Sequence, residues 1–290
     1  MFHGVIVATV TPFRNGKLDR NALKRLIRFQ IENGTDGVVP CGTTGESATL
    51  SFDEHERVID IALESADGRI PVIAGTGSNN TREAIVLTRY AKRAGANAAL
   101  VITPYYNKPP QEGLVRHFLA VAESTDIPII LYNVPGRTGV NMTPATVARL
   151  AEIPNIVGIK EASGNLNQVC DIIRTTPKKF CVLSGDDFLF FPMMALGAKG
   201  VISVASNVAP ALMSELYDTY IIGELSRARD IHFRLWPLFG ALFIETNPIP
   251  AKTALAMMRK IHEEFRLPLS PMAEANRKTL AKVLSDLKIV

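Results

Sequence analysis

The sequence predicts an α/β fold, a (β/α)8 TIM barrel followed by a C-terminal helical extension. Eight short apolar runs recur along the first part of the chain, with amphipathic segments between them. Their starts lie about 20 to 35 residues apart, the interval of one βα unit, and strands that alternate with helices form parallel sheets. Eight such units close into a barrel. After the eighth run only helical periodicity remains.

The eight apolar runs are the predicted barrel strands, and they occupy residues 4–13, 37–46, 71–79, 98–106, 128–136, 156–164, 181–187 and 200–206. The segments between them carry apolar residues at helical spacing, together with capping residues and terminal glycines. The clearest predicted helices start at the capping residue Asp19, within residues 51–68 and at Thr81, and they end at Gly34, Gly68 and Gly95.

The C-terminal part of the chain is predicted to be helical throughout. Residues 211–223 complete the eighth βα unit, and residues 226–245, 249–265 and 270–288 form three further helices. We therefore expect a catalytic barrel over residues 1–224 and a helical extension over residues 225–290. No low-complexity or Gly/Ser linker separates the two, so the extension is expected to pack against the barrel.

The composition is that of a globular protein. Of 290 residues, 47% are hydrophobic and 21% are charged, and the net charge is only +4 with both signs interspersed, so no nucleic-acid-binding surface is indicated. The N-terminus lacks a signal-peptide pattern and no apolar stretch approaches ~18 residues, so we expect a cytoplasmic protein without a membrane partner. Cys41, Cys170 and Cys181 suit neither a disulfide framework nor a zinc site. Cys41 is a weak candidate thiol nucleophile, since no histidine partner is evident.

The segment "IVGIKEAS" reads as a buried strand that ends on Lys160. A strand-end lysine usually returns the chain to solvent. However, active sites of (β/α)8 barrels lie at the carboxyl ends of the strands, and a lysine held in apolar surroundings can act as an amine nucleophile toward a carbonyl. Tyr132, at the end of the preceding strand, is placed to move protons beside such a lysine.

Two further segments at strand ends carry candidate site residues. In "CGTTGES", Thr43 and Thr44 could bind a small carboxylate or relay a proton, or they could simply cap the next helix. In "NVPGRTG", Arg137 could pair with a substrate carboxylate, although a surface arginine is the simpler interpretation. No metal-ligand spacing, phosphate loop or dinucleotide fingerprint is present, so no cofactor is expected.

The segments "CGTTGES", "YYNKP", "YNVPGRTG", "GIKEAS" and "GVISV" together resemble the dihydrodipicolinate synthase family of pyruvate-dependent class I aldolases, over essentially the whole chain. The resemblance implies a lyase that condenses pyruvate with L-aspartate 4-semialdehyde to 4-hydroxy-tetrahydrodipicolinate in lysine biosynthesis by the diaminopimelate pathway. It also implies a homotetramer built as a dimer of dimers. Relatives that share the lysine, N-acetylneuraminate lyase and 2-keto-3-deoxy sugar acid aldolases, are the alternative, and a non-enzymatic binding protein is a third possibility.

The resemblance also implies roles by position. The catalytic residues would be the Schiff-base lysine Lys160, the acid/base Tyr132, the relay residue Thr44, and Tyr106 supplied by a neighbouring subunit. The substrate-binding residues would be Thr43, Arg137, Gly185 and Ile202. In lysine-inhibited members the effector L-lysine binds at a dimer interface, at positions that match Ser47, Ala48, His55, Asn79, Glu83 and Tyr105.

One residue departs from the pattern of lysine-sensitive bacterial relatives, which often have a histidine where this chain has Phe52. The family pattern therefore implies lysine inhibition that is present but weakened. The alternative is that His55 and Glu83 are simply solvated helix residues.

Overall fold

The computed structural model describes residues 2–290, whose contacts divide into two compact units. The first unit contains residues 2–3 and 72–202, and the second contains residues 4–71 and 203–290. Across the described residues the main sheet has eight strands, and its strands alternate with helices. The predicted (β/α)8 fold is thus confirmed. The domain boundary predicted between residues 224 and 225 stays a prediction.

The first unit contains parallel strands in the order β10-β9-β8-β7-β6-β5. Their side chains are almost entirely buried, as expected for strands covered on both faces. The strands are β5 (Ile73–Gly75), β6 (Ala98–Ile102), β7 (Ile129–Asn133), β8 (Ile156–Glu161), β9 (Cys181–Ser184) and β10 (Gly200–Ser203).

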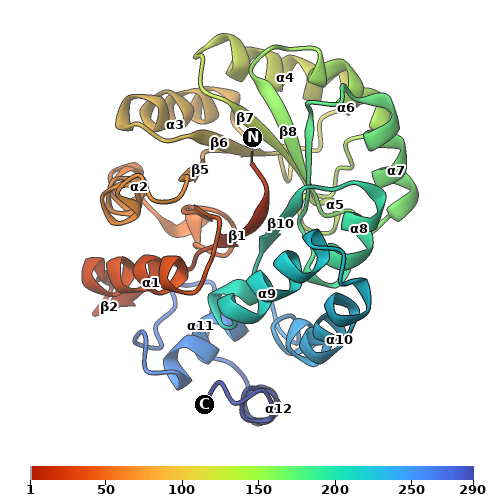
Figure 1. Cartoon of the computed structure of the whole chain (residues 1–290). Coiled ribbons are helices and arrows are strands. Elements are labelled where there is room, and N and C mark those ends of the chain that lie inside the picture. Colours follow the sequence, from red (N-terminus) through yellow and green to blue (C-terminus); the bar gives the residue numbers. More distant parts are fainter. Residues whose placement is uncertain (1) are drawn as a thin grey trace. The chain divides into compact units, whose positions relative to one another are not determined.

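Helices cover the outside of these strands, as α3, α4, α6 and α7 show in Figure 1. Each buries one apolar face; in α3, for example, Ala84, Leu87 and Ala91 are buried, and the helix ends at Gly95 in the left-handed conformation. The helical elements of this unit are α3 (Thr81–Ala94), α4 (Gln111–Glu123), α5 (Pro135–Thr138), α6 (Pro144–Ala151), α7 (Leu166–Thr175), the 3₁₀ turn η2 (Asp187–Leu189) and α8 (Phe190–Leu196).

The second unit contains the parallel pair β1 (Gly4–Ala8) and β4 (Gly37–Val39). The predicted helix starts are confirmed here: Asp19 accepts from Ala22 N at 2.9 Å, and Ser51 forms a capping box with Glu54. The helical elements are α1 (Arg20–Glu32), η1 (Ser47–Thr49), α2 (Phe52–Ala66), η3 (Ala205–Asn207), α9 (Pro210–Ile221), α10 (Leu225–Ala241), α11 (Ile249–Met257) and α12 (Glu274–Asp286).

Two local features of the second unit differ from the sequence prediction. A short hairpin of β2 (Phe13–Arg14) and β3 (Lys17–Leu18) turns at Asn15 and Gly16, which both have positive φ. The helix predicted over residues 249–265 ends at Met257, and Arg259 has a φ of 57°. The following carboxylates have partners elsewhere in the unit: Glu264 accepts from the backbone N–H groups of the hairpin turn, which favours a loop over a continued helix.

No helix within residues 2–290 combines the length and the apolar character needed to cross a membrane.

Candidate active site

Lys160 and Tyr132 lie side by side at the carboxyl ends of two neighbouring strands. The parallel register of β7 and β8 pairs Tyr132 directly with Lys160, and only 7% and 6% of these residues are exposed. The Lys160 Nζ atom lies 4.3 Å from the centroid of the Tyr132 ring. The Lys160 amine therefore lies beside the phenol ring in a largely buried position, which suits a lysine that reacts with a carbonyl group. The predicted adjacency of these two residues is confirmed, and their catalytic roles stay predictions.

Gly185 provides space for the Lys160 side chain. A Cβ atom at this position would lie 3.0 Å from both Cγ and Cε of Lys160 and 2.7 Å from Cβ of Ala162, so any larger residue would displace the lysine stem. The Gly185 N–H donates to the Glu161 carbonyl at 2.8 Å, which holds the glycine close to the end of β8. Ile202 lies buried in β10, one residue beyond the Val201 that pairs with β9.

A buried carboxylate that the sequence analysis missed holds the ends of β7 and β8 together. Glu161 is only 1% exposed and accepts from Asn133 Nδ2 at 3.0 Å, from the Ser163 N–H at 2.7 Å and from Gln168 Nε2 at 3.3 Å. Because side chains alternate along a strand, Asn133 and Glu161 point away from the face that carries Tyr132 and Lys160. Their positions next to the two predicted site residues were the available signal in the sequence.

Arg137, Tyr105 and Tyr106 lie in segments of the same unit that follow β7 and β6. Arg137 is exposed on the short helix α5 that follows β7. Tyr106 is 89% exposed and has a φ of 71°, in the left-handed region that aromatic residues rarely adopt. The loop is tied down next to it, because Asn107 Nδ2 donates to the Asn79 carbonyl at 2.9 Å. The protein thus holds an exposed tyrosine in a strained backbone conformation, which is a common property of functional sites.

Thr43 and Thr44 lie in the second unit, in a turn closed by backbone hydrogen bonds from Gly45 N to Gly42 O and from Glu46 N to Thr43 O. Neither threonine caps a helix: the residue before η1 is Glu46, and the cap of α2 is Ser51. The interpretation of these threonines as helix caps is therefore wrong. Thr44 is buried, and its Oγ1 accepts a hydrogen bond from Asn247 Nδ2 at 2.9 Å.

The same turn is anchored by a buried ion pair. Lys252 of α11 donates to Glu46, and their side chains are 0% and 1% exposed. The Lys252 Nζ atom lies 4.4 Å from the centroid of the Phe13 ring, and the Arg266 N–H donates to the second oxygen of Glu46 at 3.2 Å. Burial lowers the pKa of Lys252, and the Glu46 carboxylate opposes this change. No sequence pattern pointed to this pair, whose members are 206 residues apart.

The residues assigned to a lysine pocket occur in both units. In the second unit, Ser47 and Ala48 lie in η1 and His55 is buried in α2, so the interpretation of His55 as a solvated residue is wrong. In the first unit, Asn79 and Glu83 lie before and within α3, and Tyr105 lies in the loop described above. Glu83 accepts from Ser78 Oγ at 2.8 Å and from Asn80 Nδ2 at 3.2 Å. Phe52 is half-exposed at the start of α2.

Cys41 does not fit a role as nucleophile. It is buried, its Sγ donates to the His55 carbonyl at 3.5 Å, and burial raises the pKa of its thiol well above the usual range. Since the thiolate is the reactive form, this thiol is inert.

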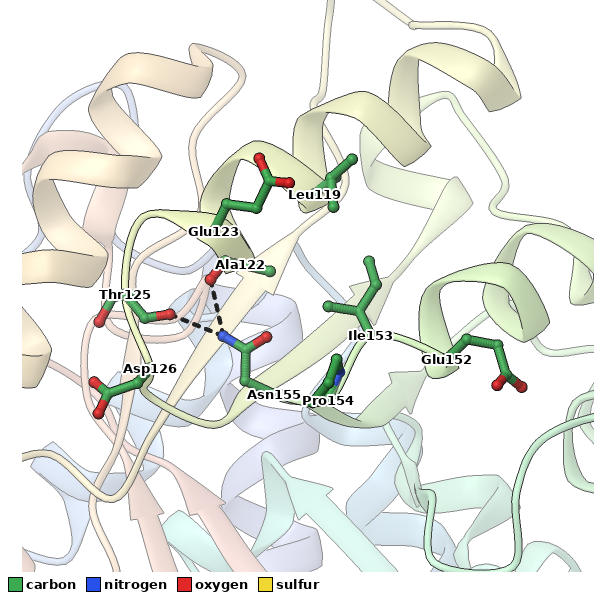
Figure 2. A pocket seen from close by; sticks show the side chains of 9 residues that line it. All are labelled: Leu119, Ala122, Glu123, Thr125, Asp126, Glu152, Ile153, Pro154 and Asn155. Carbon is green, nitrogen blue, oxygen red and sulfur yellow. Dashed lines mark hydrogen bonds between the residues drawn. The ribbon is translucent and has the colours of Figure 1, made fainter.

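The first unit has a surface pocket of about 560 Å³ that contains none of the predicted site residues. It lies between the end of α4 and the loop that leads into β8, where Asn155 Nδ2 donates to the carbonyls of Ala122 and Thr125 (Figure 2). This is the amino end of β8, opposite to the edge that carries Lys160, and in (β/α)8 barrels the amino ends of the strands serve stability.

The fold and the buried lysine–tyrosine pair define an aldolase-type (β/α)8 barrel enzyme. Comparison with known proteins identifies the family: the chain matches the Dihydrodipicolinate synthetase family over residues 1–287, and it belongs to that family. It is 60% identical to the 4-hydroxy-tetrahydrodipicolinate synthase of Syntrophus aciditrophicus, with 100% of both chains covered.

Solved structures of this family agree with the fold. The dihydrodipicolinate synthase of Aquifex aeolicus superposes with a TM-score of 0.98 at 53% identity, over 99% of both chains. The enzyme of Cyanidioschyzon merolae with lysine bound superposes with a TM-score of 0.97 at 41% identity, over 100% of this chain and 99% of that one.

The Glu46–Lys252 pair gives a prediction about stability. Lys252→Met leaves the Glu46 carboxylate buried without its cation, so we expect the free energy of unfolding, measured by chemical denaturation, to fall by about 3–5 kcal/mol. The double variant Glu46→Gln/Lys252→Met removes the uncompensated charge and is expected to recover much of this loss. As control, Lys282→Met breaks the exposed pair with Asp286 and is expected to cost about 0–1 kcal/mol. An equal cost for the two single variants would contradict the assignment.

Proposed function

We propose that this chain condenses pyruvate with L-aspartate 4-semialdehyde to form 4-hydroxy-tetrahydrodipicolinate, the first committed step of lysine biosynthesis by the diaminopimelate pathway. The observation that carries the proposal is the buried Lys160 beside Tyr132, in a chain that matches relatives with this activity over their full length. We place the enzyme in the cytoplasm, which suits its free cysteines and its biosynthetic substrates.

The chemistry begins with the lysine. The Lys160 amine attacks the ketone carbon of pyruvate, and loss of water gives a protonated imine. The imine withdraws electrons, so a methyl proton of bound pyruvate is lost and an enamine forms. The enamine carbon then attacks the aldehyde of the second substrate, whose own amine finally displaces Lys160 and closes the ring. We assign the proton transfers near the amine to the Tyr132 hydroxyl, whose ring lies beside Lys160.

The remaining roles belong to the same proposal. Thr44 relays protons between Tyr132 and a Tyr106 supplied by a neighbouring subunit. Thr43 binds the pyruvate carboxylate and Arg137 that of the semialdehyde, a pairing that suits a guanidinium. Gly185 and Ile202 line the site. The placement of Gly185 is supported by its position next to the Lys160 side chain, where a Cβ atom would meet the lysine.

A homotetramer, built as a dimer of dimers, agrees with two surface features. Tyr106 is held in an exposed and strained conformation, which suits a residue that is used by another subunit. A second region exposes apolar side chains over the end of α9 and along α10, and such areas typically mark protein contacts. It contains Ile221, Ile222, Leu225, Phe233 and Trp236.

We also propose that L-lysine inhibits the enzyme. A carboxylate, Glu83, is held in place at the start of α3 by Ser78 and Asn80, and it can pair with an ammonium group. The hydrogen bond from Asn107 to the Asn79 carbonyl connects this region to the loop that carries Tyr105 and Tyr106. An effector at Ser47, Ala48, His55, Asn79, Glu83 and Tyr105 would thus bias the position of the catalytic tyrosine.

The Schiff base on Lys160 and the identity of the substrate are testable by trapping and by turnover. Borohydride added with pyruvate is expected to attach a reduced pyruvyl group to Lys160, to abolish activity, and to leave Lys160→Ala unlabelled, as peptide mass spectrometry will show. Turnover is expected with pyruvate and aspartate semialdehyde but not in the cleavage of N-acetylneuraminate or 2-keto-3-deoxygluconate. Turnover of a sugar acid with none of the semialdehyde would support the alternative relatives instead.

The use of Tyr106 across an interface is testable by mixing subunits. Tyr106→Phe is expected to lower kcat by about 100-fold, because a proton-transfer group is lost, while pyruvate still forms the imine. Mixing the impaired Tyr106→Phe subunits with inactive Lys160→Ala subunits is expected to raise activity well above that of either variant alone, since a mixed dimer has one complete site. Tyr90→Phe, on α3, serves as a control that retains activity. No recovery on mixing, or a fully active monomer in sedimentation, would contradict the shared site.

Lysine inhibition is tested by titrating L-lysine at fixed substrate concentrations. We expect inhibition that Glu83→Ala removes and that Phe52→His strengthens, because the histidine adds a hydrogen bond worth about 1 kcal/mol. Glu112→Ala removes a carboxylate from the first turn of α4 and is expected to leave the inhibition unchanged. A flat activity curve at millimolar lysine, or inhibition that survives Glu83→Ala, would show that this region does not regulate the enzyme.

A further inference from the structure

The hydroxyl group of Thr44 accepts a hydrogen bond from a buried side chain, Asn247, in the C-terminal part of the chain. Asn247 Nδ2 donates to Thr44 Oγ1 at 2.9 Å, and the two residues are 4% and 3% exposed. A threonine hydroxyl has one proton and two acceptor positions, and it rotates freely unless a partner holds it. An amide N–H can only donate. The contact therefore occupies one acceptor position of Thr44 and leaves its proton for a different partner.

The backbone that carries Thr44 has little freedom to move within the second unit. Thr11 Oγ1 donates to the Gly45 carbonyl at 2.7 Å, and a Cβ atom on Gly45 would lie 3.2 Å from both Cys41 N and the Thr9 carbonyl oxygen. The hydroxyl rotation of Thr44 is thus the main freedom that remains, and Asn247 is the residue that acts on it.

Asn247 is itself held close to the turn. It lies two residues before α11, and α11 carries the Lys252 that donates to Glu46. The C-terminal segment therefore contacts the turn twice, at Thr44 through Asn247 and at Glu46 through Lys252. Two buried polar contacts on either side of Gly45 fix the distance from Asn247 to Thr44 more strongly than one contact could.

We propose that Asn247 is a positioning residue, which orients the Thr44 hydroxyl so that its proton is available for transfer during the reaction. The inference deepens the proposed function and rests on it, because it assigns to Thr44 the relay described above. A relay needs each hydroxyl to accept on one side and donate on the other, and an unoriented hydroxyl satisfies this only part of the time. Residues 225–290 would then contribute directly to the rate of proton transfer.

The test separates orientation from packing. Asn247→Ala is expected to lower kcat about tenfold, the effect of one lost hydrogen bond, with the KM for pyruvate and the extent of borohydride trapping retained. Asn247→Asp keeps the shape of the side chain, but an ionised carboxylate can only accept a hydrogen bond from Thr44. The Thr44 proton then points to the carboxylate and is no longer available to the relay. We expect the kcat of this variant to match that of Asn247→Ala at neutral pH. As pH falls and the new carboxyl becomes protonated, it donates again and kcat is expected to recover relative to wild type.

The pairwise dependence on Thr44 is measured by a double-mutant cycle. In a Thr44→Val background, where no hydroxyl remains to orient, Asn247→Ala is expected to change kcat less than twofold. Asn276→Ala is the matched control, since it loses a hydrogen bond to Glu245 in the same loop without touching Thr44, and it is expected to retain wild-type kcat.

The outcomes distinguish this inference from the proposed function. If wild-type protein neither traps pyruvate nor turns over the semialdehyde, the proposed function fails. If wild type does both, the positioning role is overturned by an equal tenfold loss from Asn247→Ala in the Thr44→Val background. It is equally overturned by an Asn247→Asp variant whose pH profile is parallel to that of wild type. The aspartate variant keeps the test decisive if the alanine variant fails to fold.

Discussion

The parallel pairing of β7 with β8 is the constraint on which the candidate site depends. Its register places Tyr132 opposite Lys160 and Asn133 opposite Glu161. Because side chains alternate across a strand, one pair faces the site and the other faces away, where Glu161 gathers hydrogen bonds from Asn133, Ser163 and Gln168. A shift of β8 by one residue could place Glu161 opposite Tyr132, which would bury a carboxylate where the amine is needed. The same pairing therefore supplies both the reactive group and the network that holds it.

Two buried lysines, Lys160 and Lys252, have different neighbouring side chains. Lys252 is enclosed with a carboxylate partner, Glu46, which repays part of the desolvation of its ammonium group. Lys160 lies instead over the face of the Tyr132 ring, a weaker partner for a positive charge. The ion pair of Lys252 connects α11 to the turn that carries Glu46. The ring contact of Lys160 instead places its amine beside the Tyr132 phenol, and the proposed Schiff-base chemistry rests on this arrangement.

The C-terminal helices share one compact unit with the first strands. Residues 4–71 and 203–290 form one compact unit, and Asn247, Lys252 and Arg266 all contact the segment around Thr44 and Glu46. Many different enzymes share the barrel fold, so specificity resides in the residues grafted onto it. In this chain the threonine turn receives its support from residues about 200 positions further along the sequence.

Local sequence patterns determined the alternation of strands and helices, the helix cap at Asp19, and the placement of Lys160 and Tyr132 at strand ends. These features depend on side-chain periodicity and on short-range hydrogen bonds, which a linear sequence displays directly. The sequence did not reveal the partners of Thr44 and Glu46, the burial of His55, or the early end of α11. Each of these follows from contacts between segments that are distant in the sequence. A buried polar group is costly without a hydrogen bond, so it pairs with a group that the fold places next to it. Only the tertiary structure decides which partner that is.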